Sequence, residues 1–260
     1  QITSEDQVLG TLDWNIINPA TGPVYIEDAK PGDILKVEIL DIEIGDKGVF
    51  LTGPDLGTLG HIIKEEKIKI VDIKDGKVIF NEKIHIPIEP MIGVIGTAPQ
   101  GEGIPTGTPG DHGGNMDCKR ITKGSTLYLP VNVDGALLAI GDLHAVMGDG
   151  EVAVCGVETP GEVTVKVTVL KDIELPLPML IDGERMMTIA SAKTLEEASV
   201  LATENMHKIL TDIVGMDVNE AVMLLSAIGD LRICQIVDPL MTVRMELPLW
   251  VLEEYDYPTL

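Results

Sequence analysis

Apolar residues at every second position are the feature that most limits how this chain can fold. Successive side chains of a strand point to opposite faces, so this period predicts strands that bury one face. An unbroken apolar row consists of Val163, Val165, Val167 and Val169. Residues 34–39 alternate in the same way after a Pro-Gly-Asp turn, with Leu35, Val37 and Ile39 on one face. Both segments are predicted strands of a half-buried sheet.

The same pattern recurs elsewhere in the chain. Residues 66–88 predict two strands joined by a hairpin turn at Asp75 and Gly76. Further strands are expected at 125–133, 231–239 and 241–248. Strands separated by short turns favour antiparallel sheets, layered as a sandwich or a partial barrel. Hydrophobic residues make up 45% of the chain but aromatic residues only 3%, so the core must consist mainly of aliphatic side chains and Met.

The last third of the chain shows helical periodicity. Thr194 is an expected N-cap with Glu197 three residues later, and the helix that follows should end at Gly215. A second helix is expected after Asn219 and before Gly229. We therefore predict one α+β, strand-rich domain over residues 1–260, with a strand-rich body at 1–190 and a helix pair with closing strands at 191–260.

The charge balance limits the partners of this protein. Its 42 acidic and 19 basic residues give a net charge of −23. This field would repel nucleic acid or an anionic membrane, whereas it would attract a cation and would not repel a small neutral substrate. We therefore expect neither a nucleic-acid nor a membrane partner.

The spacing of the cysteines and the length of the apolar runs indicate in which cellular compartment the protein resides. Cys118, Cys155 and Cys234 are widely spaced and do not form the pattern of a disulfide framework or a zinc ribbon. The sequence shows no signal peptide and no apolar run of about 18 residues or more. These features favour a soluble, cytoplasmic protein.

A stretch rich in Gly and Pro, residues 96–115, should exclude both helix and strand. Loops of this length in a compact domain are often binding loops or else disordered linkers. Residue types that bind metals crowd the end of this stretch and the segment that follows, up to residue 151. That crowding favours a binding loop.

Three pairs of polar residues, each spaced two apart, occur in residues 111–151. Alternate residues of a strand share one face, so the members of each pair would point the same way in an extended segment. The pairs are Asn115 with Asp117, Asp142 with His144, and Asp149 with Glu151. All three could converge on one cleft, and the neighbouring glycines would let the backbone approach a bound group closely.

Carboxylate and imidazole groups together suit a divalent metal. Zinc prefers nitrogen and sulfur ligands with one carboxylate, whereas calcium and magnesium prefer oxygen. Acidic residues outnumber histidines here, and the segment matches neither H-E-x-x-H nor an EF-hand loop, so the pattern leaves the metal open. Structural alternatives exist: Asp142 and Asp149 follow glycines as turn residues do, and His144 could be a buried core histidine. Cys118 is expected to be a small buried residue rather than a nucleophile.

Residues 111–151 closely resemble the acetamidase/formamidase family. The family elements His-Gly-Gly-Asn-x-Asp, Gly-Ser-x-x-x-x-Pro-Val, Gly-Asp-x-His and Gly-Asp-Gly-Glu occur in order at 112–117, 124–131, 141–144 and 148–151. The likeness extends to residues 1–6, 31–39, Glu158 and 229–239 and covers essentially the whole chain. Family chains usually have a further N-terminal segment, which we expect this chain to lack. The loop before Asp111 resembles the short form of the family.

The resemblance implies hydrolysis of a short aliphatic amide, formamide or acetamide, to a carboxylate and ammonia. Our hypothesis places a divalent metal, expected to be zinc, on Asp117, Asp142 and His144. Glu151 or Glu158 would act as general base and then acid. Asn115 and His112 would orient the substrate or its oxyanion. A second site that binds calcium, and a homodimer or larger homo-oligomer, are also expected.

Other functions stay open at this point. The acidic cluster could bind a structural calcium in a β domain without catalytic activity. The chain could instead hydrolyse a larger or a cyclic amide. If Cys118 were the nucleophile, its replacement by Ser would abolish turnover and a chelator would not.

Overall fold

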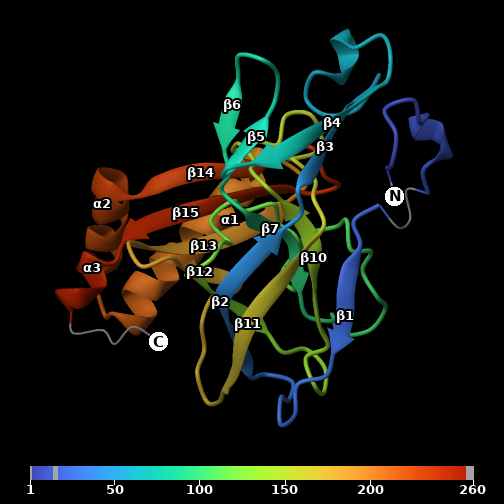
Figure 1. The fold of residues 1–260 in the computed structure, drawn as a ribbon. Helices are drawn as coiled ribbons and strands as arrows, with labels where there is room; N and C mark the ends of the chain where they lie inside the picture. Colours follow the sequence, from blue (N-terminus) through green and yellow to red (C-terminus); the bar gives the residue numbers. More distant parts are fainter. Residues whose placement is uncertain (1, 14–16, 256–260) are drawn as a thin grey trace.

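The computed structural model describes residues 2–13 and 17–255, and the strands in these residues pair antiparallel into three sheets (Figure 1). The largest sheet has seven strands, in the order β11, β2, β9, β12, β13, β15 and β14. Their bounds are β2 Ile34–Ile44, β9 Thr126–Pro130, β11 Gly161–Leu170, β12 Met179–Ile181, β13 Arg185–Ala192, β14 Asp230–Gln235 and β15 Met241–Pro248.

Two smaller sheets have four strands each. One has the order β1, β10, β7 and β8, with bounds Ala20–Val24, Leu138–His144, Met91–Gly96 and Gly113–Asn115. The other has the order β3, β4, β5 and β6, with bounds Lys47–Thr52, Lys67–Lys74, Lys77–Ile79 and His85–Pro87. The predicted turn at Asp75 and Gly76 joins β4 to β5. Two short 3₁₀ helices, η1 (Leu9–Thr11) and η3 (Gly60–Ile62), lie in the connections.

The first hydrophobic core lies between the seven-stranded sheet and the sheet that contains β7 and β10. Ile92 and Ile95 of β7 are fully buried in it, together with Leu127 and Leu129 of β9. Aliphatic side chains and Met dominate this core, as the composition predicts. The predicted layered antiparallel arrangement is confirmed, and the sheets do not close into a barrel.

The alternation of β2 and β11 is confirmed, with one difference. Leu35, Val37 and Ile39 are at most 1% exposed and lie in the first core, as predicted. The valine row of β11 faces the same core but is only partly buried. The reason is that β11 is the edge strand of its sheet. Val163, Val165 and Val167 line a cavity there.

A second core lies between the seven-stranded sheet and α1 (Leu195–Lys208). The Thr194 side chain accepts a hydrogen bond from the Glu197 backbone N–H at 3.2 Å, so the predicted cap is confirmed. Ala198, Ala202 and Met206 recur at helical spacing and are fully buried. The helix continues as a π-helical segment, η4 (Ile209–Ile213), before Gly215.

The second helix, α2 (Val218–Ile228), begins earlier than predicted. Asp217 is its N-cap, because the Asp217 side chain accepts hydrogen bonds from the N–H groups of Asn219 and Glu220. A short helix, α3 (Trp250–Glu253), follows β15 (Figure 1, red). No helix in the described residues is long and apolar enough to cross a membrane.

The Gly- and Pro-rich stretch contains more structure than predicted. Its last residues form β8, which pairs with β7 by placing Asn115 opposite Val94 and Gly113 opposite Gly96. Gly113 and Gly114 have φ angles of 93° and 80°, a region that glycine adopts without strain. The prediction that no strand forms in residues 96–115 is therefore wrong at 113–115, and the glycines themselves allow the close pairing.

Candidate active site

His144 ends β10 and lies among carboxylates. Its Nε2 atom lies 3.0 Å from Glu158 Oε1, 3.8 Å from Asp142 Oδ2 and 3.9 Å from Asp117 Oδ1. We call these four residues the His144 cluster. The structure thus brings together the three predicted metal ligands, whose ligand atoms lie within 4.8 Å of one another.

Neighbouring strands place the acids of this cluster. β10 carries Asp142, and Asp117 follows β8, which lies on the other side of β7. Between them, Gly93 of β7 leaves room, since a Cβ there would lie 2.6 Å from Asp117 Oδ1 and 2.9 Å from Asp142 Oδ2. A glycine at this position is therefore needed for the two carboxylates to approach each other.

Glu158 reaches the cluster through backbone pairing. Its N–H donates to Val49 O at 3.0 Å, and Val49 N–H donates back to Glu158 O at 2.9 Å. A second isolated bridge pairs Glu158 with His144. The Gly156 N–H donates to Glu158 Oε1 at 3.0 Å, which fixes the carboxylate beside the imidazole.

A second group of acids shares Asp117. Asp117, Glu151 and Asp238 each offer a carboxylate oxygen within 4.8 Å of the others, and we call them the oxygen cluster. Gly150 N–H donates to Cys234 O at 2.8 Å, which ties the segment of Glu151 to β14. The side chain of Gln235, the last residue of β14, accepts a hydrogen bond from Asp238 N–H at 3.0 Å. The connection after β14 thereby brings Asp238 to the site.

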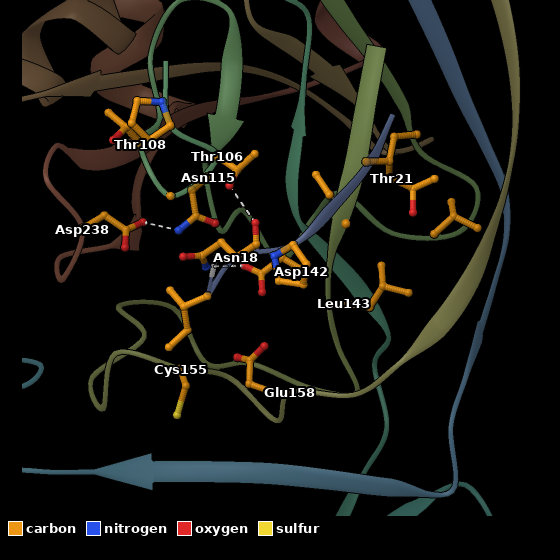
Figure 2. A pocket seen from close by; sticks show the side chains of 18 of the residues that line it. Asn18, Thr21, Thr106, Thr108, Asn115, Asp142, Leu143, Cys155, Glu158 and Asp238 are labelled. Carbon is orange, nitrogen blue, oxygen red and sulfur yellow. Dashed lines mark hydrogen bonds between the residues drawn. The ribbon is translucent and has the colours of Figure 1, made fainter. Parts of the chain in front are cut away.

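Two asparagines bind these carboxylates directly (Figure 2). Asn115 Nδ2 donates to Asp238 Oδ2 at 2.9 Å, and Asn18 Nδ2 donates to Asp142 Oδ2 at 3.0 Å. The sequence analysis singled out Asn115 but missed Asn18 and Asp238. Spacing carries no signal for either, because their partners lie more than one hundred residues away in the chain.

His112 is buried but belongs to neither cluster. Its ring packs against Gly114, where a Cβ would lie 2.9 Å from His112 Nε2. Burial lowers the pKa of His112, although Asp111 opposes this effect. Its predicted part in orienting the substrate stays a prediction.

Asp149 does not converge on the site, so this part of the prediction is wrong. Its carboxylate accepts hydrogen bonds from Arg244 at 2.8 and 3.0 Å and lies 3.5 Å from Lys119 Nζ. The rule of alternate faces fails because residues 148–151 form a turn rather than a strand. Only Glu151 of this pair enters the site.

The backbone at the site departs from regular strand geometry. Asp117, Asp142 and Glu151 have φ angles of 43°, 56° and 47°. Residues other than glycine adopt this left-handed region at a cost of roughly 1–3 kcal/mol, and such residues concentrate at functional sites. Three of them within two adjoining acid clusters point to a functional site here.

Burial and mutual repulsion raise the pKa of these acids. Burial, followed by the charge of Asp117, raises the pKa of Glu151 to about 11. In the same way the pKa of Asp238 rises to about 9. Burial also raises the pKa of Asp117 and of Asp142. Although burial alone would lower the pKa of His144, Glu158 and the neighbouring acids raise it well above its usual range.

The donor set fits a divalent cation. Both carboxylate oxygens of Asp117 are buried and have no hydrogen-bond partner among the described residues. A buried carboxylate without a donor or a cation is strongly disfavoured. The His144 cluster offers oxygen ligands and one imidazole nitrogen, whereas the oxygen cluster offers oxygen alone. Both sets are of kinds that divalent metals take in proteins.

A cavity of about 1750 Å³ opens above the two clusters (Figure 2). Its polar end is lined by Asn18, Asn115, Asp142, Glu151, Glu158 and Asp238. Thr106 and Thr108, from the loop before β8, also line it, so this loop is part of the cavity wall. The prediction of a binding loop agrees with this position.

Comparison with known proteins gives a consistent result. The model of the Acetamidase/Formamidase family matches residues 1–104 and 100–254. The solved acetamidase of Bacillus halodurans is 52% identical, with a TM-score of 0.97 over 98% of this chain and 86% of that chain. A protein of Thermoanaerobacter tengcongensis, described as a predicted acetamidase/formamidase, is 49% identical, with a TM-score of 0.97 over 100% of this chain and 86% of that chain.

One relative aligns over a smaller share of both chains. The formamidase of Methylophilus methylotrophus is 27% identical over 62% of this chain and 54% of its own length. This chain therefore spans about half the length of that relative. The fold and the matches together define a hydrolase that acts on linear amides. The chain belongs to the acetamidase/formamidase family.

Proposed function

We propose that this protein hydrolyses formamide and acetamide to the carboxylate and ammonia, and that it does so with a divalent metal, zinc, held by Asp117, Asp142 and His144. The observation that carries the metal is the Asp117 carboxylate, whose two oxygens are buried without a hydrogen-bond partner among the described residues. The facing carboxyls of Glu151 and Asp238 can donate to it only while they are protonated. When bound, the metal would polarise the amide carbonyl and lower the pKa of a water molecule.

Proton transfer is the part that we assign to Glu158. Its carboxylate lies 3.0 Å from His144 Nε2, and it lines the cavity with a side chain that is 30% exposed. Glu158 can therefore meet both the attacking water and the amide nitrogen. It would take a proton from the water and deliver it to the nitrogen, which makes ammonia the leaving group.

Glu151 is the less suitable base. Burial raises the pKa of Glu151 to about 11, so this carboxyl would carry a proton near neutral pH when no cation is bound. We propose that Glu151, Asp117 and Asp238 hold calcium, because this oxygen-only group resembles the ligand sets of calcium more than those of zinc.

Metal analysis and ammonia release test the proposal together. Purified protein should contain a divalent metal and release ammonia from formamide or acetamide. A chelator should abolish release, and zinc should restore it. If metal-loaded protein releases no ammonia from either amide, the amidase assignment fails and a calcium-binding domain without activity becomes the better description. If activity survives complete removal of the metal, only the metal assignment fails.

A mechanism with a cysteine nucleophile predicts instead that activity resists a chelator and is lost when that cysteine is replaced. Cys118 is fully buried in the first core and does not line the cavity. Cys155 does line it, but burial raises the pKa of this thiol to about 12, so it is a poor nucleophile. We expect Cys118→Ser and Cys155→Ser each to keep kcat within about threefold of wild type. Loss of turnover in either variant, with activity that resists chelation, would favour a thiol nucleophile.

The cavity supports a second candidate, hydrolysis of a larger amide. Its volume of about 1750 Å³ far exceeds the size of formamide, and Val163, Val165 and Val167 give it an apolar wall. A series of unbranched amides from formamide to hexanamide separates the candidates. A value of kcat/KM that falls after acetamide favours short substrates, whereas a rise toward hexanamide favours the larger ones.

We also propose a cytoplasmic homo-oligomer. β11 and β14 are the edge strands of the seven-stranded sheet, and exposed edges favour pairing with or covering by another chain. The three cysteines are free thiols, which suits a reducing compartment. Light scattering of the purified protein tests the oligomer, and a monomer mass would contradict it.

A further inference from the structure

Asn115 differs from the other polar residues of the cavity in having a buried acceptor atom without a partner. It ends β8, is 3% exposed, and lines the cavity. Its Nδ2 donates to Asp238 Oδ2 at 2.9 Å. Its Oδ1 is buried and has no hydrogen-bond partner among the described residues. Figure 2 shows this oxygen turned away from Asp238, toward the side where Asn18 and Asp142 lie.

Asp238 fixes the orientation of the Asn115 amide. Asp238 Oδ2 accepts a hydrogen bond from the NH₂ end of the Asn115 side chain, which leaves the Asn115 oxygen on the opposite side. Asp238 is itself held in place, because the Gln235 side chain accepts hydrogen bonds from the N–H groups of Val237 at 2.9 Å and Asp238 at 3.0 Å.

Gln235 is a rigid support for this arrangement. It is fully buried, and its Nε2 donates to Leu240 O at 2.6 Å and to Thr242 Oγ1 at 3.0 Å. Both ends of the Gln235 amide are therefore engaged. Gln235 thus holds the backbone of Asp238 in position, and Asp238 in turn holds the orientation of the Asn115 side-chain amide.

We propose that Asn115 Oδ1 accepts a hydrogen bond from the amide nitrogen of the substrate, and that Asn115 thereby selects amides that carry at least one N–H group over tertiary amides and esters. This inference rests on the proposed amide hydrolysis. Primary and secondary amides place an N–H where the acceptor needs one, whereas a tertiary amide or an ester leaves Oδ1 unpaired. Leaving a buried acceptor unpaired lowers binding by roughly 10- to 100-fold.

A comparison of N-methylacetamide with N,N-dimethylacetamide tests this role. The two differ by one methyl group, but only the first has an N–H. Wild-type protein should show a ratio of kcat/KM between them that exceeds the ratio in Asn115→Ala by roughly 10- to 100-fold. Differences in the leaving amine are the same in both proteins and cancel in this double comparison.

Asn132→Ala is the matched control. Asn132 lies outside the active-site cavity, and within the described part of the chain its side chain donates a single, long hydrogen bond, 3.4 Å, to Ala98 O. This variant should keep the wild-type ratio. Equal ratios in wild type and Asn115→Ala would overturn the proposal. Loss of bound metal in Asn115→Ala would overturn it as well, because Asn115 would then serve the metal rather than the substrate.

Binding without turnover provides a second measurement. The rise in Tm with N-methylacetamide should exceed the rise with N,N-dimethylacetamide in wild type, and the two should be equal in Asn115→Ala. This result is expected even if the variant turns over neither amide, and equal rises in wild type would contradict it. Wild type that releases no amine or ammonia from any amide but shows the Tm difference would refute the proposed function and leave the recognition by Asn115 standing.

Discussion

Two ionic clusters in this protein differ in how their charges are balanced. In the first, Arg244 of β15 is 2% exposed and donates two hydrogen bonds to Asp149 and one, at 2.7 Å, to Glu246. We call these three residues the Arg244 cluster. In the His144 cluster, three carboxylates surround one imidazole, and the two oxygens of Asp117 have no hydrogen-bond partner among the described residues.

The difference separates a structural cluster from a functional one. A buried charge that meets its counter-charge within the chain needs nothing further. A buried acid without a donor keeps a proton or requires a cation from outside, and the raised pKa values of Asp117 and Asp142 express this. Unbalanced charge, rather than buried charge as such, therefore distinguishes the candidate active site.

The largest effect is expected from Asp117→Asn. This change removes a proposed metal ligand shared by both acid clusters, so kcat/KM for acetamide should fall by roughly 1,000-fold or more. It also removes one of several repelling acids, so the variant in chelator should have a Tm no lower than that of wild type. Asp134→Asn is the control, because Asp134 is exposed and pairs only with Lys30 on the surface. A marked fall in Tm would show that other residues of the chain already balance the charge of Asp117.

Arg244→Met should have the opposite effect, a loss of stability with little change in activity. It removes the hydrogen bonds that Arg244 donates to Asp149 and Glu246 and leaves these carboxylates only the longer ion pairs with Lys119 and Arg185, both at 3.5 Å. This should lower the free energy of unfolding by about 3 kcal/mol. Urea denaturation measures this change. The matched control is Arg232→Met, since Arg232 is more than half exposed and its ion pair with Asp230 should contribute less than about 1 kcal/mol. Equal losses in the two variants would refute the view that the Arg244 cluster stabilises the fold.

The two clusters also differ in how far the sequence predicts them. Asp142 and His144 could be paired because both lie at nearby positions of one strand, β10, although Asp142 itself has a left-handed φ of 56°. The pairing of Asp149 with Glu151 failed because residues 148–151 form a turn, and Asp149 instead binds Arg244, 95 residues later in the chain. Spacing describes local geometry, whereas ion pairs between distant strands depend on the sheet order.

The fold shows the same limit. Strand and helix periods predict α1 and five strands of the seven-stranded sheet, because each pattern reflects which face is buried locally; β12 and β13 were not predicted. The order of the strands and the contact of Asp238 with Asn115 are not contained in any local pattern. β8 was not predicted because it has three residues, two of them glycines, and therefore shows no alternation of apolar and polar side chains. The resemblance to a family singled out the candidate residues; only the structure showed that Asp117 lacks a hydrogen-bond partner among the described residues.

The smallest expected effect, from Gly156→Ala, distinguishes position from charge in the His144 cluster. A Cβ at Gly156 would lie 2.6 Å from His144 Nδ1 and 2.7 Å from its Cγ, so the imidazole or the backbone must shift. No charge changes, yet a small displacement of a proposed metal ligand should lower activity, and we expect kcat/KM for acetamide to fall about 10-fold. Gly10→Ala is the control, because nothing lies within 4 Å of its added Cβ. If Gly156→Ala keeps wild-type kcat/KM, the exact position of His144 matters little, and the unbalanced charge of the cluster alone accounts for its part in the reaction.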